Sequence, residues 1–256
     1  ASSALEGADP EVALAAAQAL TDRAPDRPQG WYMLGLAWAN LGENAKALAR
    51  LPLESVPHVV VGGSFDFLRD KPWTTVDVDN LGGAEQAVKH LVQLGHEQIL
   101  HIGGWFEKSD EFDRLRGYRR ALKQCGFDVD DSLILEGGPG CGADAAADIV
   151  RNALSETDEP PTAVFAGGFA LALGAVKAAQ ELGLEVPNDI SLMGFDDFEM
   201  AEYLAPPLTT VRQPIYELGL KAGKMLDQSM EYGPKKEGYH VHFDTELIVR
   251  KSCSPP

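Results

Sequence analysis

The sequence predicts an α/β protein with two Rossmann-like parallel-sheet subdomains, preceded by a short all-α helical-hairpin segment. Two observations lead to this fold class. Between residues 56 and 252, short continuous apolar runs alternate with amphipathic helical patterns, which is typical of parallel strands covered on both faces. Residues 1–55 instead carry alanine, leucine and tryptophan at helical spacing, without a β-branched run.

Residues 1–55 form the predicted helical segment, with breaks at Pro25, Pro28 and Leu41-Gly42. The spacing resembles one and a half tetratricopeptide-type repeats. Because fewer than three such repeats seldom fold alone, we expect the segment to pack on the remainder of the chain. A groove that binds a partner is the alternative. The matching residues are Trp31, Leu34, Gly35, Trp38, Gly42 and Ala47, with Ala13 and Pro25 in the preceding half repeat.

Residues 56–252 supply the alternating strands and helices. Asp79 and Asn80 are expected to cap the first helix, with a pair of ligand contacts as the alternative, and Gly95 is expected to end the helix. Ligands of such sheets bind at the carboxyl ends of the strands. The expected strands are 57–63, 75–79, 98–102, 133–136, 163–166, 190–195 and 240–250, and the expected helices are 81–94, 113–124, 143–154, 171–182 and 215–230.

Charge and cysteine content exclude several classes of protein. The net charge of −17 over 256 residues would repel a phosphate backbone, so we expect no direct contact with nucleic acid. The 3 cysteines lack paired spacing, which favours a reducing cytoplasm over a disulfide framework or a thiolate metal site. No apolar run approaches the roughly 18 to 20 residues of a membrane helix, and no signal-peptide pattern opens the sequence. We therefore expect a cytoplasmic protein without a membrane partner.

Motifs for enzymatic chemistry are also missing from the sequence. The glycine-rich stretch 137–142 lacks the Gly-Lys-Ser/Thr of a phosphate loop. His240 and His242 share a strand face but have no convincing third metal ligand. Nothing resembles a Ser/His/Asp constellation. We expect no enzyme, no metal and no cofactor.

A series of short motifs follows a fixed order along the chain. Each is weak alone, but the ordered set resembles the effector-binding domain of the LacI/GalR family of transcription regulators over residues 56–252. The motifs are Val78–Asn80 with Gly83-Ala84, His90-Leu91, Leu94–His96, Arg114 with Gly117-Tyr118, Pro161–Ala166, Gly183-Leu184 with Val186-Pro187, Asp189–Ser191, Gly194–Asp197, Pro206–Val211 with Gln213-Pro214, and Leu247–Arg250.

The resemblance implies two subdomains of periplasmic-binding-protein type, with a small molecule, expected to be a carbohydrate, in the cleft between them. The first subdomain would comprise residues 56–96 and 211–232, and the second residues 97–205 and 238–252, within a domain of residues 56–256. A homodimer would pass the effector signal to DNA through a headpiece not present in this chain. A periplasmic-type sugar-binding transport protein and a helical-repeat interaction scaffold are the alternatives.

Arg114 and Asp196 are the leading candidates for effector contact. The planar fork of Arg114 can hold two hydroxyls or one carboxylate, and the resemblance implies that it touches the effector. Its alternative role is neutralisation of nearby acidic side chains. Asp196 directly follows an apolar strand, so its carboxylate can accept hydrogen bonds from vicinal hydroxyls. The alternative for Asp196 is a helix N-cap, a role that Asp197 could fill instead.

Three further residues complete the expected site. Lys108 and Asp110 occupy positions where the resemblance implies polar effector contacts; solvated loop charges are the alternative. Phe169 follows Gly168 where the family usually has Asn-Asp, which removes two hydrogen-bonding side chains and adds a ring for stacking. Core packing is the alternative for Phe169.

The front of the chain departs most from the family. The headpiece, the hinge, and the first two strands and two helices of the first subdomain are not recognisable in residues 1–55. Either the chain is a fusion, natural or engineered, or the first subdomain is incomplete and helices cover its exposed sheet edge.

Overall fold

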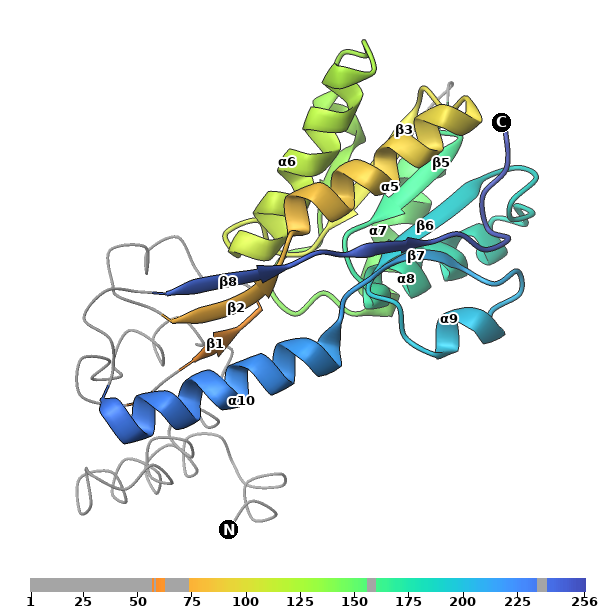
Figure 1. Ribbon diagram of the computed structural model, residues 1–256. Coiled ribbons are helices and arrows are strands. Elements are labelled where there is room, and N and C mark those ends of the chain that lie inside the picture. The colour runs from red at the N-terminus through yellow and green to blue at the C-terminus, as the bar shows by residue number, and fades with distance from the viewer. Residues whose placement is uncertain (1–56, 58, 63–73, 156–159, 234–238) are drawn as a thin grey trace. The chain divides into compact units, whose positions relative to one another are not determined.

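The computed structural model describes residues 57, 59–62, 74–155, 160–233 and 239–256 (Figure 1). The chain divides into two compact units, and the larger comprises Val60–Asp66, Thr75–Ala222 and His240–Pro256. This larger unit contains every residue predicted to contact the effector. The predictions for residues 1–55, including the repeat-like helices, lie outside the described residues.

A six-stranded sheet forms the centre of the larger unit, in the order β4-β3-β5-β6-β7-β9. All neighbouring strands are parallel except β9, which runs antiparallel to β7. The parallel order agrees with the predicted alternation of strands and helices. The strands are β3 (Ile99–Gly103), β4 (Ile134–Glu136), β5 (Ala163–Ala166), β6 (Ser191–Phe195), β7 (Thr209–Arg212) and β9 (Glu246–Ile248).

A second sheet of three parallel strands has the order β1-β2-β8. It consists of β1 (Val60–Val61), β2 (Thr75–Val78) and β8 (His240–Phe243). The predicted late strand at residues 240–250 is therefore two strands in different sheets. The sequence Asp244-Thr245 separates them, and alternation alone could not show that the chain changes sheets there.

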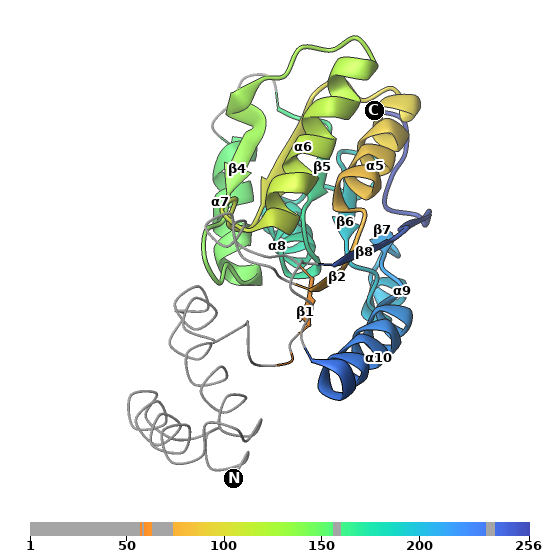
Figure 2. The same cartoon turned by 60° about the vertical axis from the view of Figure 1, so that its left-hand side comes forward.

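Four long helices cover the six-stranded sheet (Figures 1 and 2). Alternate strand residues point to opposite faces: Ile99 and Phe165 pack with α5 and α6, whereas Leu100 and Val164 pack with α7 and α8. The fold is therefore a three-layer arrangement with a core on each side of the sheet. The helices are α5 (Asn80–Leu94), α6 (Ser109–Gln124), α7 (Ala143–Ser155) and α8 (Phe169–Glu181).

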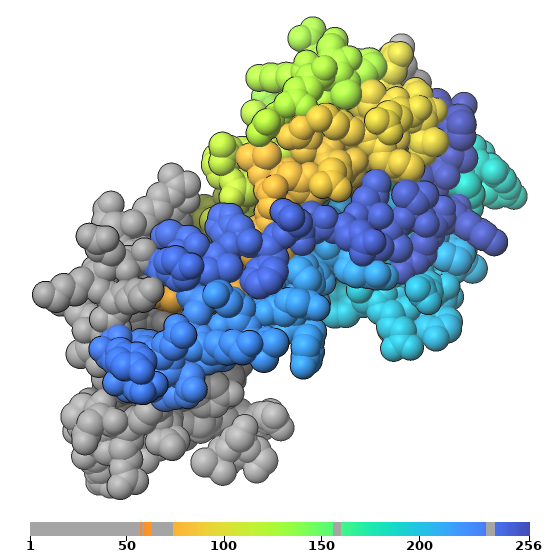
Figure 3. All heavy atoms as spheres, viewed as in Figure 1, coloured from red at the N-terminus to blue at the C-terminus, as the bar shows by residue number. Residues whose placement is uncertain are grey.

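The first helix, α5, shows how local sequence determines its ends. Asp79 is the N-cap, as predicted, and its carboxylate accepts from the backbone N–H of Gly82 at 2.8 Å. Gly95 ends the helix in the left-handed region with φ of 104°, where a side chain would add strain. The helix contacts β7 and β9, and Figure 3 shows it (yellow) beside the C-terminal strand segment (blue).

Helices α5 and α6 approach each other closely at Gly117. A Cβ atom at Gly117 would clash with the backbone carbonyl of Leu81 and would lie 2.8 Å from the Cβ of Ala84. Glycine is therefore required here for close packing rather than for backbone freedom. This contact fixes the start of α5 against α6, which carries Arg114.

Two further α-helices lie among the described residues, and several helix boundaries differ from the prediction by one to four residues. The short α9 (Met200–Tyr203) precedes β7, and α10 (Ile215–Tyr232) follows it. Helix α6 begins at Ser109, four residues before the predicted start, because Asp110 and Glu111 are acidic residues that favour a first helical turn. Among the described residues, no helix is long and apolar enough to cross a membrane. The proposed subdomain boundaries stay predictions.

Candidate functional site

Arg114 lies in the second turn of α6 at the centre of the predicted site, and its side chain is only 6% exposed. Its Nε donates to Oδ1 of Asn80 at 2.9 Å, and its Nη1 donates to the backbone carbonyl of Gly167. The guanidinium carbon lies 3.9 Å from the centroid of the Phe195 ring, a cation–π geometry. Arg114 thus joins α5, the β5–α8 connection and β6, and it is buried rather than exposed at the surface.

Two carboxylates face the guanidinium of Arg114. Nη1 lies 3.8 Å from Oε1 of Glu111, and Nη2 lies 3.9 Å from Oδ1 of Asp196. Burial raises the pKa of Glu111, while Arg114 and the backbone N–H of Gly104, at 2.9 Å, oppose that rise. The structure therefore brings Arg114 and Asp196, the two leading candidates, together. Only one carboxylate oxygen of Asp196 approaches the guanidinium, so the pair is not bidentate.

Asp196 follows β6 directly, as the sequence indicates, and adopts a left-handed backbone with φ of 73°. Asparagine and aspartate tolerate this region better than most residues. The side chain is 23% exposed, and Gln213 donates to its Oδ1. Among the described residues, both polar contacts of Asp196 involve Oδ1, so Oδ2 can accept from a ligand. Asp196 is not a helix cap, because α9 begins only at Met200 and its N-cap is Glu199.

Asp197, the other candidate cap, has a structural role. Its side chain is 4% exposed and accepts from Arg250 at 2.7 Å and from Thr210 at 2.6 Å. Burial alone would raise its pKa, but the hydrogen bonds from Arg250, Thr210 and Arg212 together lower it. Asp197 therefore ties the end of β6 to β7 and to the C-terminal segment.

Lys108 and Asp110 lie at the start of α6, and the charge of Asp110 acts on Asp77 of β2. The Nζ of Lys108 is 3.1 Å from Oδ2 of Asp110, whereas Oδ1 of Asp110 is buried and has no hydrogen-bond partner among the residues that the structure describes. Burial raises the pKa of Asp77, and the charge of Asp110 adds to this rise. An unpartnered buried carboxylate oxygen is costly, so this position favours a donor from a ligand or water.

Phe169 is the predicted residue that the structure does not bring to Arg114. It is the first residue of α8, and its ring packs 5.0 Å from that of Phe198 in a tilted arrangement. It also contacts the core on the α7–α8 face. The neighbouring Gly168 lies nearer the site, since a Cβ there would be 3.7 Å from Oδ2 of Asp196. Core packing, the alternative for Phe169, thus describes its observed contacts.

Four residues of this cluster were not predicted as site residues. Asn80 was expected to cap α5, but its amide accepts from Arg114 and donates to Asp77. The sequence indicates Glu111 only as an acidic neighbour of Arg114. Gly167 contributes a backbone carbonyl, and Gln213 holds Asp196. Two of these residues, Asn80 and Gln213, lie in the family motifs Val78–Asn80 and Gln213-Pro214. Neither motif indicates which side chain the residue would hydrogen-bond.

Comparisons with known proteins agree with this fold. Residues 88–253 match the family described as periplasmic binding protein-like domain. The HTH-type transcriptional regulator DegA of Bacillus subtilis (strain 168) is 35% identical over 219 residues, which cover 83% of this chain and 61% of DegA. The transcriptional regulator CelR in complex with cellobiose has a TM-score of 0.71 and 28% identity, over 85% of this chain and 70% of that chain.

A LacI family transcriptional regulator from Enterococcus faecium with bound ribose has a TM-score of 0.66 and 27% identity, over 86% of this chain and 75% of that chain. The fold and the family match define an α/β domain of periplasmic-binding-protein type. The chain belongs to the periplasmic binding protein-like family, and it is similar to the corresponding part of LacI family regulators. It spans about three fifths of the length of DegA.

Proposed function

We propose that this chain is the effector-sensing part of a LacI/GalR-type transcription regulator and that a small polar molecule, a sugar, binds beside Arg114 and Asp196. The observation that carries the proposal is that Arg114 links the start of α5, the β5–α8 connection and the end of β6. Two structurally similar regulators hold cellobiose and ribose, which supports a carbohydrate effector.

The proposed contacts follow from the chemistry of each residue. Asp196 presents Oδ2 as an acceptor for a sugar hydroxyl. Arg114 orients Asp196 through the ion pair with its other carboxylate oxygen, Oδ1. Asp110 offers its unpartnered Oδ1 as a second acceptor, and Lys108 provides a cationic donor beside it. Phe169 is proposed as an apolar wall at the edge of the site.

The proposed mechanism is allosteric. An effector that binds one arrangement of the subdomains more tightly shifts the population towards it, and only this difference in affinity can transmit a signal. DNA would be contacted by a headpiece and not by this acidic domain. We propose that the protein acts in the cytoplasm and catalyses no reaction; the similar proteins named above are regulators.

Sugar titration tests the proposal. We expect isothermal titration against a panel of neutral mono- and disaccharides to find one that binds, and Asp196→Asn to weaken it about 10- to 100-fold, because a hydrogen bond to a carboxylate is lost. Asp128→Asn, at an exposed loop position, is the matched control and should bind like the parent. Equal affinity of parent and Asp196→Asn, or no binding sugar, would show that the proposed site is wrong.

We also propose that the domain forms a homodimer. Exposed apolar side chains gather before and within α9 and on the first turns of α10, with Tyr203 76% and Tyr216 78% exposed. Such patches often mark protein interfaces. Sedimentation equilibrium at micromolar concentration should give twice the monomer mass, and Tyr216→Glu should shift the protein towards monomer. If the parent protein sediments as a monomer, the proposed homodimer is wrong. The other exposed members are Phe198, Met200, Ile215 and Leu220.

A further inference from the structure

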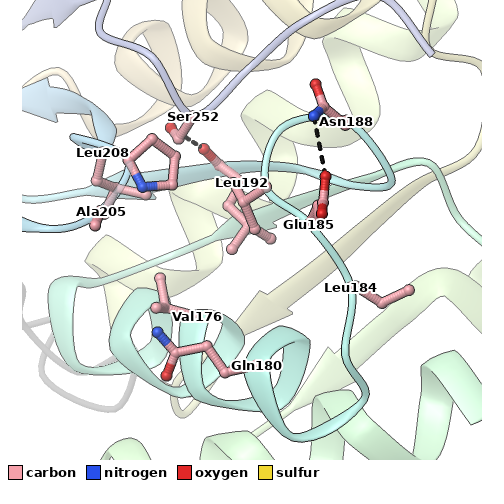
Figure 4. A pocket seen from close by; sticks show the side chains of 11 residues that line it. Val176, Gln180, Leu184, Glu185, Asn188, Leu192, Ala205, Leu208 and Ser252 are labelled. Carbon is pink, nitrogen blue, oxygen red and sulfur yellow. Dashed lines mark hydrogen bonds between the residues drawn. The ribbon is translucent and has the colours of Figure 1, made fainter.

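A cavity of about 290 Å³ lies within the larger unit and does not include any residue of the proposed sugar site (Figure 4). It is partly open to solvent and is lined by α8, the connection from α8 to β6, β6 itself, the segment between α9 and β7, and Ser252 of the C-terminal segment. Leu192, near the start of β6, forms part of its wall, whereas Asp196 follows the end of that strand. The cavity thus lies at the opposite end of β6, about 13 Å away at the usual rise per strand residue.

The inner wall of the cavity is apolar and firmly packed. Leu192 and Leu208 are each 1% exposed, and Val176 and Val186 extend the apolar lining. Ser252 also lines it, but its hydroxyl already donates to the carbonyl of Leu192 at 2.6 Å and accepts from the N–H of Thr209 at 2.8 Å. This wall therefore favours the hydrocarbon part of a ligand.

Among the polar side chains that line the cavity, Glu185 alone is charged. Gln180, Glu185 and Asn188 contribute polar side chains, and no basic residue is among the residues that line the cavity. The carboxylate of Glu185 accepts from Asn188 at 3.3 Å, which is a long hydrogen bond (Figure 4). The carboxylate can thus take a stronger, charge-assisted donor.

We propose that this cavity is a second small-molecule site, which binds a compact apolar ammonium compound with its hydrocarbon body against Leu192 and Leu208 and its cationic group at Glu185. The volume suits about ten non-hydrogen atoms, at the roughly 30 Å³ that a water molecule occupies in the liquid. The proposal does not depend on the sugar site, because the two sites share no residue.

Binding of matched probes tests the charge preference. Cyclohexylmethylammonium is expected to bind the full chain with a dissociation constant of about 1 mM, measured by NMR chemical-shift titration. Cyclohexylmethanol has the same shape without the charge, and it should bind about three- to tenfold more weakly. Cyclohexylacetate, which is anionic, should not bind detectably, because it would face the carboxylate of Glu185.

Two variants locate the binding. Glu185→Gln keeps the size of the side chain and should remove the preference for the ammonium over the alcohol. Ala205→Leu adds volume at an exposed lining position and should weaken both probes at least tenfold. Glu97→Gln, at an exposed position outside the cavity, is the matched control and should bind like the parent.

The proposal is overturned by any of three results. The first is no binding of the ammonium probe to the parent. The second is equal affinity for all three probes. The third is retention of the ammonium preference in Glu185→Gln, provided that circular dichroism shows the variant to be folded.

Discussion

Replacement of Arg114 by methionine is expected to lower the free energy of unfolding by about 3 to 5 kcal/mol, the usual cost of removing one partner of a buried ion pair. Methionine retains the apolar stem, so the loss comes from the guanidinium. Asn80 and the carbonyl of Gly167 would lose the hydrogen bonds from Arg114, and Glu111 would lose its cationic partner, in a region where water has little access. Urea denaturation followed by circular dichroism measures the change.

The matched control for this prediction is Arg116→Met, on the same helix. The side chain of Arg116 is 55% exposed and pairs with Asp113 at 2.8 Å, an exposed contact worth about 1 kcal/mol or less. A loss at Arg114 no larger than that at Arg116 would contradict the assignment of Arg114 as a buried link. Arg114→Lys should lie between the two, since it keeps the charge but not the planar fork.

Acidification from about pH 6.5 to about pH 4 is expected to cost about 3 kcal/mol of stability through His101 alone. His101 is fully buried on β3, and burial lowers its pKa to about 4 from the ordinary 6.5. Its folded pKa is below its unfolded pKa, so the unfolded chain takes up the proton first. The stability is therefore complete above pH 6.5 and is lost as the pH falls towards 4.

The surroundings of His101 supply both the cause and the control. Its ring stacks 5.1 Å from those of Tyr118 and Phe165, and its Nδ1 hydrogen-bonds the carbonyl of Phe165 at 3.0 Å, while Nε2 has no partner in the described part of the chain. His101→Phe keeps a ring in the stack and removes the titration. The difference in unfolding free energy between parent and variant should change by about 3 kcal/mol between these two pH values. A difference that is constant with pH would contradict the burial of a neutral histidine.

The strand and helix pattern was predictable from the sequence because it is local. Apolar runs of four or five residues gave β3, β5 and β6 nearly to the residue, and Asp79 and Gly95 marked the ends of α5. The position of Asp196 at the end of β6 followed from the same pattern. The boundary of α6 was wrong because its polar first turn has no apolar periodicity.

The partners of each site residue were not predictable, because they are distant in the chain. Arg114 meets Asn80 and Gly167 only after α5 packs on α6 and both cover the sheet. The division of the late strand into β8 and β9 likewise depends on distant pairing partners, because β8 pairs with β2 and β9 pairs with β7. The sequence of residues 240–250 does not indicate these partners.

For this protein, the sequence by itself determined the α/β class and the family resemblance, and it indicated the two charged residues that we propose for the site. These follow from the order of residues along the chain. Only the tertiary structure decided that Arg114 is buried and held by three separate segments, that the ring of Phe169 packs against Phe198, and that a cavity lies at the other end of β6. Burial and partner choice depend on contacts between residues far apart in sequence, and periodicity carries no information about them.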